Sequence, residues 1–183
     1  MRIVLAALFV PFLVLTDQLN VKGQDWRQIV PLKSTRAEVE RILGATATTY
    51  FAEYELKQGS LFVEYSGGPC KPEPKGGWNV PKDVVIMISF TPKRKTRIAS
   101  LKLDPKKFRK VVDDHAIGVL YYVNDEEGIT YQVQSGKIDF VEYHPAKRDE
   151  HLYCGDPADE KQRPVKQAQY SRQIPISLES HER

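Results

Sequence analysis

The spacing of apolar residues predicts one short helix near the start of the chain. Thr35 and Glu38 have the Thr-x-x-Glu spacing of a capping box, in which each side chain accepts a hydrogen bond from the other residue's backbone amide. The next apolar residues recur at i, i+3 and i+4 and so share one helix face: Val39, Ile42 and Leu43. Gly44 follows where a left-handed residue commonly ends a helix. A helix of about nine residues is not stable alone, so it must pack on the rest of the fold.

Runs of β-branched and aromatic residues predict a sheet after this helix, with turn residues between the runs. The predicted strands are 48–56, 60–65, 84–90, 97–103, 117–123, 129–134 and 137–143. We expect 97–103 to pair with 84–90 across the 92–96 turn. Asp104-Pro105 predicts a capped helical turn through Phe108 that could extend to Val112. Ser135-Gly136 predicts a tight hairpin between the last two strands.

This order of elements predicts an α+β fold. We expect a mostly antiparallel sheet of about six to seven strands, with one N-terminal helix and a short second helical turn packed on it. The 183 residues, 41% of them hydrophobic, suffice for one ordinary domain. We place that domain at residues 24–154. Residues 155–183 have few large apolar side chains and no periodicity, so we expect a flexible C-terminal tail.

The first residues predict a signal peptide. Arg2 precedes an apolar run from Ile3 to Leu15 that only Pro11 interrupts. Such a run fits the roughly 7–15 residues of a signal-peptide core and falls short of the ~20 that cross a bilayer. We therefore expect residues 1–23 to be removed and the mature protein to be secreted or periplasmic, without a transmembrane segment. An uncleaved membrane anchor is the alternative.

Export changes the interpretation of the two cysteines. Cys70 and Cys154 would lie in an oxidising compartment, are even in number and stand far apart in the chain. A redox pair or a metal site needs closer spacing. We therefore predict a structural disulfide, which in the chain-entropy model stabilises the fold by at most roughly 4–5 kcal/mol. Two free buried thiols or an intermolecular bridge are the alternatives.

Two segments carry a resemblance to known proteins. Residues 30–44, with a Ser-Thr cap before a helix that ends in Leu-Gly, resemble the opening of small exported α+β domains. The later hairpin, 128–141, is similar to the one that closes their sheet. The superfamily includes outer-membrane-assembly lipoproteins and β-lactamase-inhibitor proteins, although the lipidated Cys of the lipoproteins is missing here. Residues 24–154 as a whole resemble uncharacterised exported proteins of the acidobacterial type. The resemblance implies binding rather than catalysis.

The sequence contains no familiar catalytic or cofactor motif. Gly-x-Ser-x-Gly, phosphate-loop and dinucleotide patterns are missing from it. We predict no catalytic residues, no cofactor and no metal. The alternative is a small extracytoplasmic hydrolase or metal enzyme that uses His144, His151 and the cluster Asp113–His115. Polar runs of this kind more often mark loops and connections, so we favour a protein without catalytic activity.

The charge pattern supplies the candidate binding surface. The net charge of +3 is too small to suggest nucleic acid. Residues 93–110 nevertheless hold nine basic residues and only Asp104 as an acid. Folded to one side, they would form a basic face for an acidic protein or an anionic envelope surface. A solvated turn and helix surface is the alternative. The candidate residues are Lys93, Arg94, Lys95, Arg97, Lys106, Lys107, Arg109 and Lys110.

Export, charge and the resemblance together predict a binding or assembly module of the cell envelope. Its expected partner is a protein or an anionic envelope component, and nucleic acid is not expected. The sequence makes no prediction of the oligomeric state.

Overall fold

The structure, a computed structural model, describes residues 26–70, 77–113 and 116–155. The predicted signal peptide, 1–23, lies outside these residues, and so does the predicted tail beyond Gly155. Most of the predicted domain, 24–154, is described.

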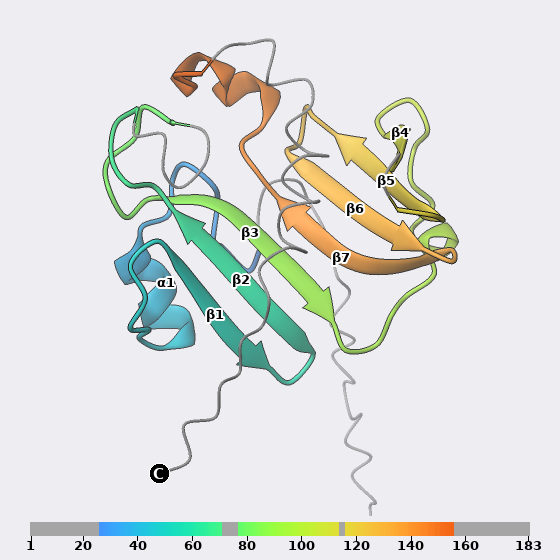
Figure 1. Cartoon of the computed structure of the whole chain (residues 1–183), viewed down its shortest axis with the longest axis horizontal. Helices are drawn as coiled ribbons and strands as arrows, with labels where there is room; N and C mark the ends of the chain where they lie inside the picture. The colour runs from blue at the N-terminus through green and yellow to red at the C-terminus, as the bar shows by residue number, and fades with distance from the viewer. Residues whose placement is uncertain (1–25, 71–76, 114–115, 156–183) are drawn as a thin grey trace, which may run out of the picture.

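Within the described residues, seven antiparallel strands form one sheet in the order β1-β2-β3-β7-β6-β5-β4 (Figure 1). This confirms the predicted mostly antiparallel sheet. The strands are β1 (Phe51–Leu56), β2 (Gly59–Tyr65), β3 (Val85–Pro92), β4 (Arg109–Val112), β5 (Val119–Asn124), β6 (Ile129–Gln134) and β7 (Lys137–Tyr143). The predicted tight hairpin joins β6 to β7. Its two turn residues, Ser135 and Gly136, both have a positive φ, of 52° and 73°, as such a two-residue turn requires.

Helix α1 (Arg36–Leu43) begins and ends where the sequence predicts. The Thr35 backbone amide donates to Glu38 Oε2 at 2.7 Å, and the Glu38 amide donates back to the Thr35 hydroxyl at 3.4 Å. Gly44, at a φ of 101°, ends the helix. Val39 is fully buried, whereas Ile42 is exposed. The buried stripe is therefore narrower than the predicted one.

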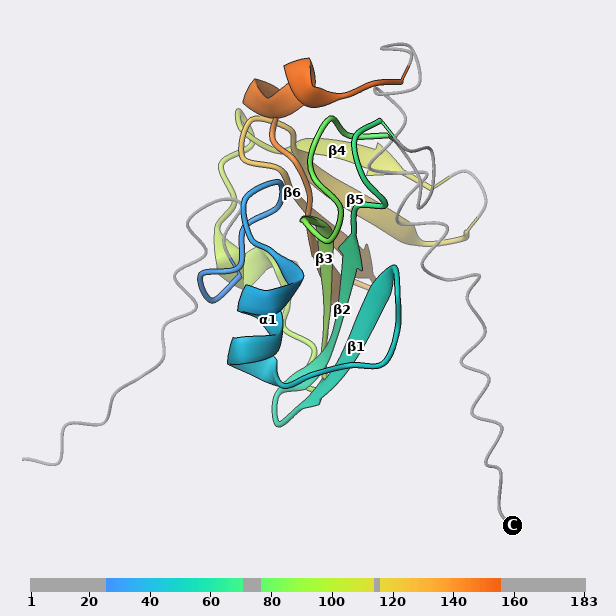
Figure 2. The ribbon, with the colours of Figure 1, turned by 90° about the vertical axis from the view of Figure 1, so that its left-hand side faces the viewer.

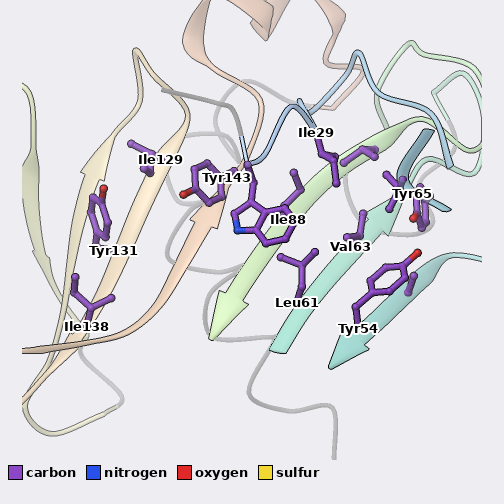
Figure 3. Close-up of a cluster of buried hydrophobic side chains, with 14 of the residues drawn as sticks. Ile29, Tyr54, Leu61, Val63, Tyr65, Ile88, Ile129, Tyr131, Ile138 and Tyr143 are labelled. Atoms are coloured by element: carbon purple, nitrogen blue, oxygen red, sulfur yellow. The ribbon is translucent and has the colours of Figure 1, made fainter. Parts of the chain in front are cut away.

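We call the side of the sheet that α1 covers the helix face. Its side chains form the main core, and Figure 3 shows several of them: Tyr54, Leu61, Val63, Ile88, Ile129, Tyr131, Ile138 and Tyr143. Trp26 and Ile29, ahead of α1, pack into the same core. On the opposite face a smaller apolar cluster holds Val119, Tyr121, Val123 and Phe140.

The predicted strand at 97–103 is wrong. The segment contains a 3₁₀ helix, η1 (Ile98–Leu101), instead. Ile98 and Leu101 are three residues apart and so lie on the same side of a 3₁₀ helix, where both pack against the main core. The neighbour of β3 is therefore β7, with Ile88 opposite Tyr143.

The predicted second helical turn forms, but it does not extend to Val112. The Lys106 amide donates to Asp104 Oδ1 at 2.9 Å, and the turn closes with the Phe108 amide on the Asp104 carbonyl at 3.1 Å. The Phe108 ring then packs on Tyr131, with 5.8 Å between centroids. The next residues form the edge strand β4, which the sequence analysis did not predict.

The predicted disulfide joins Cys70 to Cys154, with 5.4 Å between their Cα atoms. Cys154 follows a second 3₁₀ helix, η2 (Lys147–Leu152). Beside the disulfide, the Cys154 amide donates to the Gly77 carbonyl at 2.8 Å. The rings of Trp78 and Tyr153 lie 5.3 Å apart. The loop after β2 and the segment after η2 are thus held together by one covalent bond and by packing.

Candidate functional site

Most of the predicted basic residues lie on one segment, residues 93–108, which we call the strap. The Ile138 amide donates to the Thr96 carbonyl at 2.8 Å, and the Ile98 amide donates to the Gly136 carbonyl at 3.1 Å. These bonds fix the start of the strap to β7. Figure 2 shows the strap, in light green, on the same side of the sheet as α1. Its apolar side chains pack against the main core: Ile98, Leu101, Leu103 and Phe108.

Because the apolar side chains of the strap face the sheet, its basic side chains face solvent. All seven basic residues of the strap are exposed: Lys93, Arg94, Lys95, Arg97, Lys102, Lys106 and Lys107. Lys102 directly follows η1 with a φ of 48°. The strap therefore has an apolar inner side and a basic outer side.

Acidic side chains accompany the basic residues at both ends of the strap. The ion pairs are Lys93–Glu55 at 3.9 Å, Lys95–Asp139, Lys107–Glu127 at 3.6 Å and Arg109–Asp125 at 3.2 Å. Each pair is partly or largely exposed and so contributes about 0–1 kcal/mol to stability. Among the described residues, no ion pair involves four further basic residues: Arg94, Arg97, Lys102 and Lys106. These four are exposed and have no acidic side chain within ion-pair distance among the described residues.

The basic residues of the strap form a stripe rather than a compact patch. The backbone of Arg97 forms an isolated antiparallel β-bridge with Lys137, beside the hairpin that joins β6 to β7. Lys107 reaches Glu127, beside the opposite end of β6. A strand of this length spans about 17–20 Å. The stripe therefore follows the length of β6.

Two of the predicted residues lie beyond the strap. Arg109 and Lys110 begin β4, the last strand of the sheet, and both are exposed. The Arg109 guanidinium lies 3.2 Å from Asp125. These two residues are thus part of a sheet edge rather than of the outer surface of the strap.

The two histidines of the enzymatic alternative have separate local partners. His144 is buried, with Nε2 at 3.2 Å from the Thr130 hydroxyl and Nδ1 at 3.0 Å from the Pro145 carbonyl. His151 is exposed, with Nδ1 at 3.0 Å from the Arg148 carbonyl. The two imidazoles thus have different surroundings: His144 contacts a buried threonine hydroxyl, whereas His151 contacts a backbone carbonyl near the surface.

The third part of that alternative is only partly described. Asp113 is buried and accepts a hydrogen bond from the Tyr121 hydroxyl at 3.0 Å. Asp114 and His115 lie outside the described residues. Within 26–70, 77–113 and 116–155, no group of three His, Cys, Asp or Glu residues is close enough to hold a metal ion.

A buried carboxyl on the opposite face of the sheet was not singled out from the sequence. Glu142, on β7, is fully buried between Ser89 of β3 and Thr130 of β6. Neither carboxyl oxygen has a hydrogen-bond partner among the described residues. Burial, and secondarily the carboxylate of Glu64, raise the pKa of Glu142 to about 8. The alternation of polar and apolar residues in β7 does not predict this burial, because a Glu in such a strand normally lies on the solvent face.

Comparisons with protein-family models, with curated proteins and with solved structures give no match for this chain. No helix in the described part of the chain is long and apolar enough to cross a membrane. The chain's own residues therefore carry the functional proposal.

Proposed function

We propose that this protein is an exported, non-catalytic binding module of the cell envelope that holds an acidic protein segment along its strap. The observation that carries the proposal is the two-sided strap. Its apolar side chains are buried in the main core, so the basic side chains stay exposed. Four of them have no ion pair among the described residues: Arg94, Arg97, Lys102 and Lys106.

The acidic residues beside the strap favour an extended polypeptide over a broad anionic surface as the partner. Asp125, Glu127 and Asp139 lie beside the ends of the strap. A uniformly anionic lipid surface would approach these carboxylates as well as the basic residues, and like charges repel. An extended acidic segment, aligned with the stripe, would meet mainly the basic residues. We therefore favour an acidic polypeptide over a lipid surface.

The predicted compartment and the resemblance support the same function. Disulfides such as Cys70–Cys154 persist chiefly in oxidising, extracytoplasmic compartments. The exported α+β domains that residues 30–44 resemble act by binding. A strap with only a few unpaired charges suits weak, salt-sensitive association, since exposed ion pairs contribute about 0.2–1 kcal/mol each.

The test is binding to a synthetic acidic peptide of about ten residues, which is long enough to follow the stripe. The variant Arg97→Glu with Lys102→Glu reverses two charges on the strap. The control, Lys33→Glu with Lys82→Glu, makes the same change in net charge at exposed positions outside the strap. We expect the native chain and the control to bind and the strap variant to lose at least about tenfold in affinity.

Salt and lipid provide the remaining comparisons. Binding should weaken as salt shortens the Debye length from about 10 Å to about 3 Å. Vesicles containing anionic lipid are tested in parallel. Binding to vesicles but not to the peptide would overturn the assignment of a protein partner. Equal binding by the strap variant and the native chain would overturn the strap as the binding surface.

A further inference from the structure

The two outer strands of the sheet carry opposite charges. Glu53 and Glu55 are exposed on β1, whereas Arg109 and Lys110 are exposed on β4. Figure 1 shows these strands at opposite ends of the sheet, and within the described residues each pairs on one side only. A strand edge without a neighbour is a template for pairing with another chain.

The same two edges expose large apolar side chains. Phe51 on β1 is 37% exposed, and Val112 on β4 is 61% exposed. An isolated exposed apolar residue is ordinary on a protein surface. Here each one stands two residues from an exposed charge of its own strand, Glu53 or Lys110, on the same face of that strand. Each edge thus presents one charged and one apolar side chain side by side.

The backbone of both edges has hydrogen-bonding groups that point away from the sheet. The Tyr65 amide donates to the Tyr50 carbonyl at 2.8 Å, so Tyr50 faces β2. Residues of an antiparallel strand alternate in direction, so the amides and carbonyls of Phe51 and Glu53 point outward. The Phe51 carbonyl accepts the Thr48 hydroxyl and keeps a second lone pair.

The same alternation applies to β4. The Asp113 amide donates to the Val119 carbonyl at 3.1 Å, so Asp113 faces β5. The amides and carbonyls of Lys110 and Val112 therefore point outward. On both edges, the residues with outward backbone groups are the ones that present the charged and the apolar side chain.

We propose that a second copy of this chain adds its β1 edge to the β4 edge of the first, in antiparallel register. Lys110 then stands opposite Glu53, and Val112 stands opposite Phe51. In this register the outward amides and carbonyls of the two edges meet, and each charge and each apolar side chain has a matching neighbour. The partner is thus another molecule of the same protein.

The register also agrees with the faces of the sheet. As the first and last of seven antiparallel strands, β1 and β4 run in the same direction. An antiparallel contact therefore needs the second copy turned over, with its helix face on the other side. Lys110, opposite Tyr122, belongs to the helix face, whereas Glu53, opposite Phe62, belongs to the other face. Turning the second copy over brings Lys110 and Glu53 to one side.

Charge selects this contact over the two symmetric ones. Pairing β4 with β4 would bring Lys110 and Arg109 of two copies together, and pairing β1 with β1 would do the same for Glu53 and Glu55. Opposed like charges destabilise a strand pair, whereas opposite charges stabilise it. The contact between β1 and β4 is heterologous, so each added copy leaves one free edge of each kind, and copies can form rings or open chains.

The test is the mass of the exported chain in solution, measured by sedimentation velocity at rising protein concentration and low salt. We expect the mean mass to increase with concentration. Lys110→Glu or Glu53→Lys alone should weaken association about tenfold, because each places like charges opposite one another. Combining the two substitutions restores opposite charges and should restore association.

Lys33→Glu is the matched control, since it makes the same charge change at an exposed position outside both edges and the strap. It should associate like the native chain. A native chain that stays monomeric at every concentration would overturn the inference, and so would single edge variants that associate normally. The inference is independent of the strap, because loss of peptide binding in Arg97→Glu with Lys102→Glu leaves both edges intact.

Discussion

The guanidinium of Arg36 lies over the ring of Tyr65, at 4.0 Å from its centroid. The same side chain reaches Asp83 through Nε at 3.0 Å and donates to the backbone carbonyls of Thr48 and Thr49. The first residue of α1 thus holds β2, the loop before β3 and the segment that leads into β1.

Arg36→Ala should therefore lower the free energy of unfolding by about 2–4 kcal/mol, since it removes a cation–π contact and several charged hydrogen bonds. Arg36→Lys keeps the charge but not the planar fork, so about 1–2 kcal/mol of that loss should remain. Urea denaturation measures both. A change below about 0.5 kcal/mol for Arg36→Ala would mean that these contacts are not formed in solution.

The disulfide should be present in the native protein and should add to its stability. Intact-mass measurement with and without reductant should show a difference of two hydrogens. Cys70→Ser with Cys154→Ser should lower the free energy of unfolding by up to roughly 4–5 kcal/mol. A thiol titration that finds both cysteines free in the native protein would contradict the pairing.

Glu142 should make stability depend on pH. Burial raises the pKa of this carboxyl from the ordinary 4.5 to about 8, so the folded state holds a proton that the unfolded state releases between these values. The native chain should therefore lose stability as pH rises through this range, at up to about 1.4 kcal/mol per pH unit, and no more above it.

Glu142→Gln removes the titrating group. It should match the native chain near pH 4 and exceed its stability increasingly up to pH 8, as measured by urea denaturation across the range. Glu150→Gln, at an exposed position outside both edge strands, is the control for a general loss of one carboxylate and should not reproduce the difference between Glu142→Gln and the native chain. Parallel profiles for Glu142→Gln and the native chain would refute the buried carboxyl as the cause.

Gly128 and Gly136 both have a positive φ, but only Gly128 also lacks the space for a side chain. Its φ is 60°, and a Cβ at this position would lie 2.1 Å from the His144 carbonyl oxygen. Gly136 also has a positive φ, of 73°, but a Cβ there would meet nothing within 4 Å. Gly136→Ala should cost about 1–2 kcal/mol from the left-handed backbone alone. Gly128→Ala should cost clearly more in thermal or urea unfolding, and equal losses would contradict the close approach.

The local signals in the sequence predict much of this fold. The capping box of Thr35 and Glu38 places α1, and the Ser135-Gly136 turn places the last hairpin, because both depend on residues close in the chain. The cysteine pair is predicted by its count and compartment. These features need no knowledge of distant neighbours.

Three other features, which depend on how distant segments pack, were not predicted. The alternating apolar residues of η1 predict a strand, but β7 takes the place beside β3 where that strand would have paired. The burial of Glu142 depends on what surrounds its side chain rather than on the alternation within β7. Likewise, the sequence shows nine basic residues close together, but only the packing of Ile98 and Phe108 shows which sides of the strap are apolar and which are charged.

The strand order has a consequence for how the sheet assembles. Strands β1 to β3 and strands β4 to β7 each pair with neighbours in sequence, so each group can form from local contacts. The two groups meet where β3 pairs with β7, through Ile88, Ser89 and Phe90. Pairing at this junction is the long-range step in forming the sheet. The strap and the disulfide each connect the two groups of strands, the strap across the helix face and the disulfide beyond the ends of β2 and β7. Native-state hydrogen exchange should therefore show two cooperative units, with the amides at the junction exchanging when the units separate.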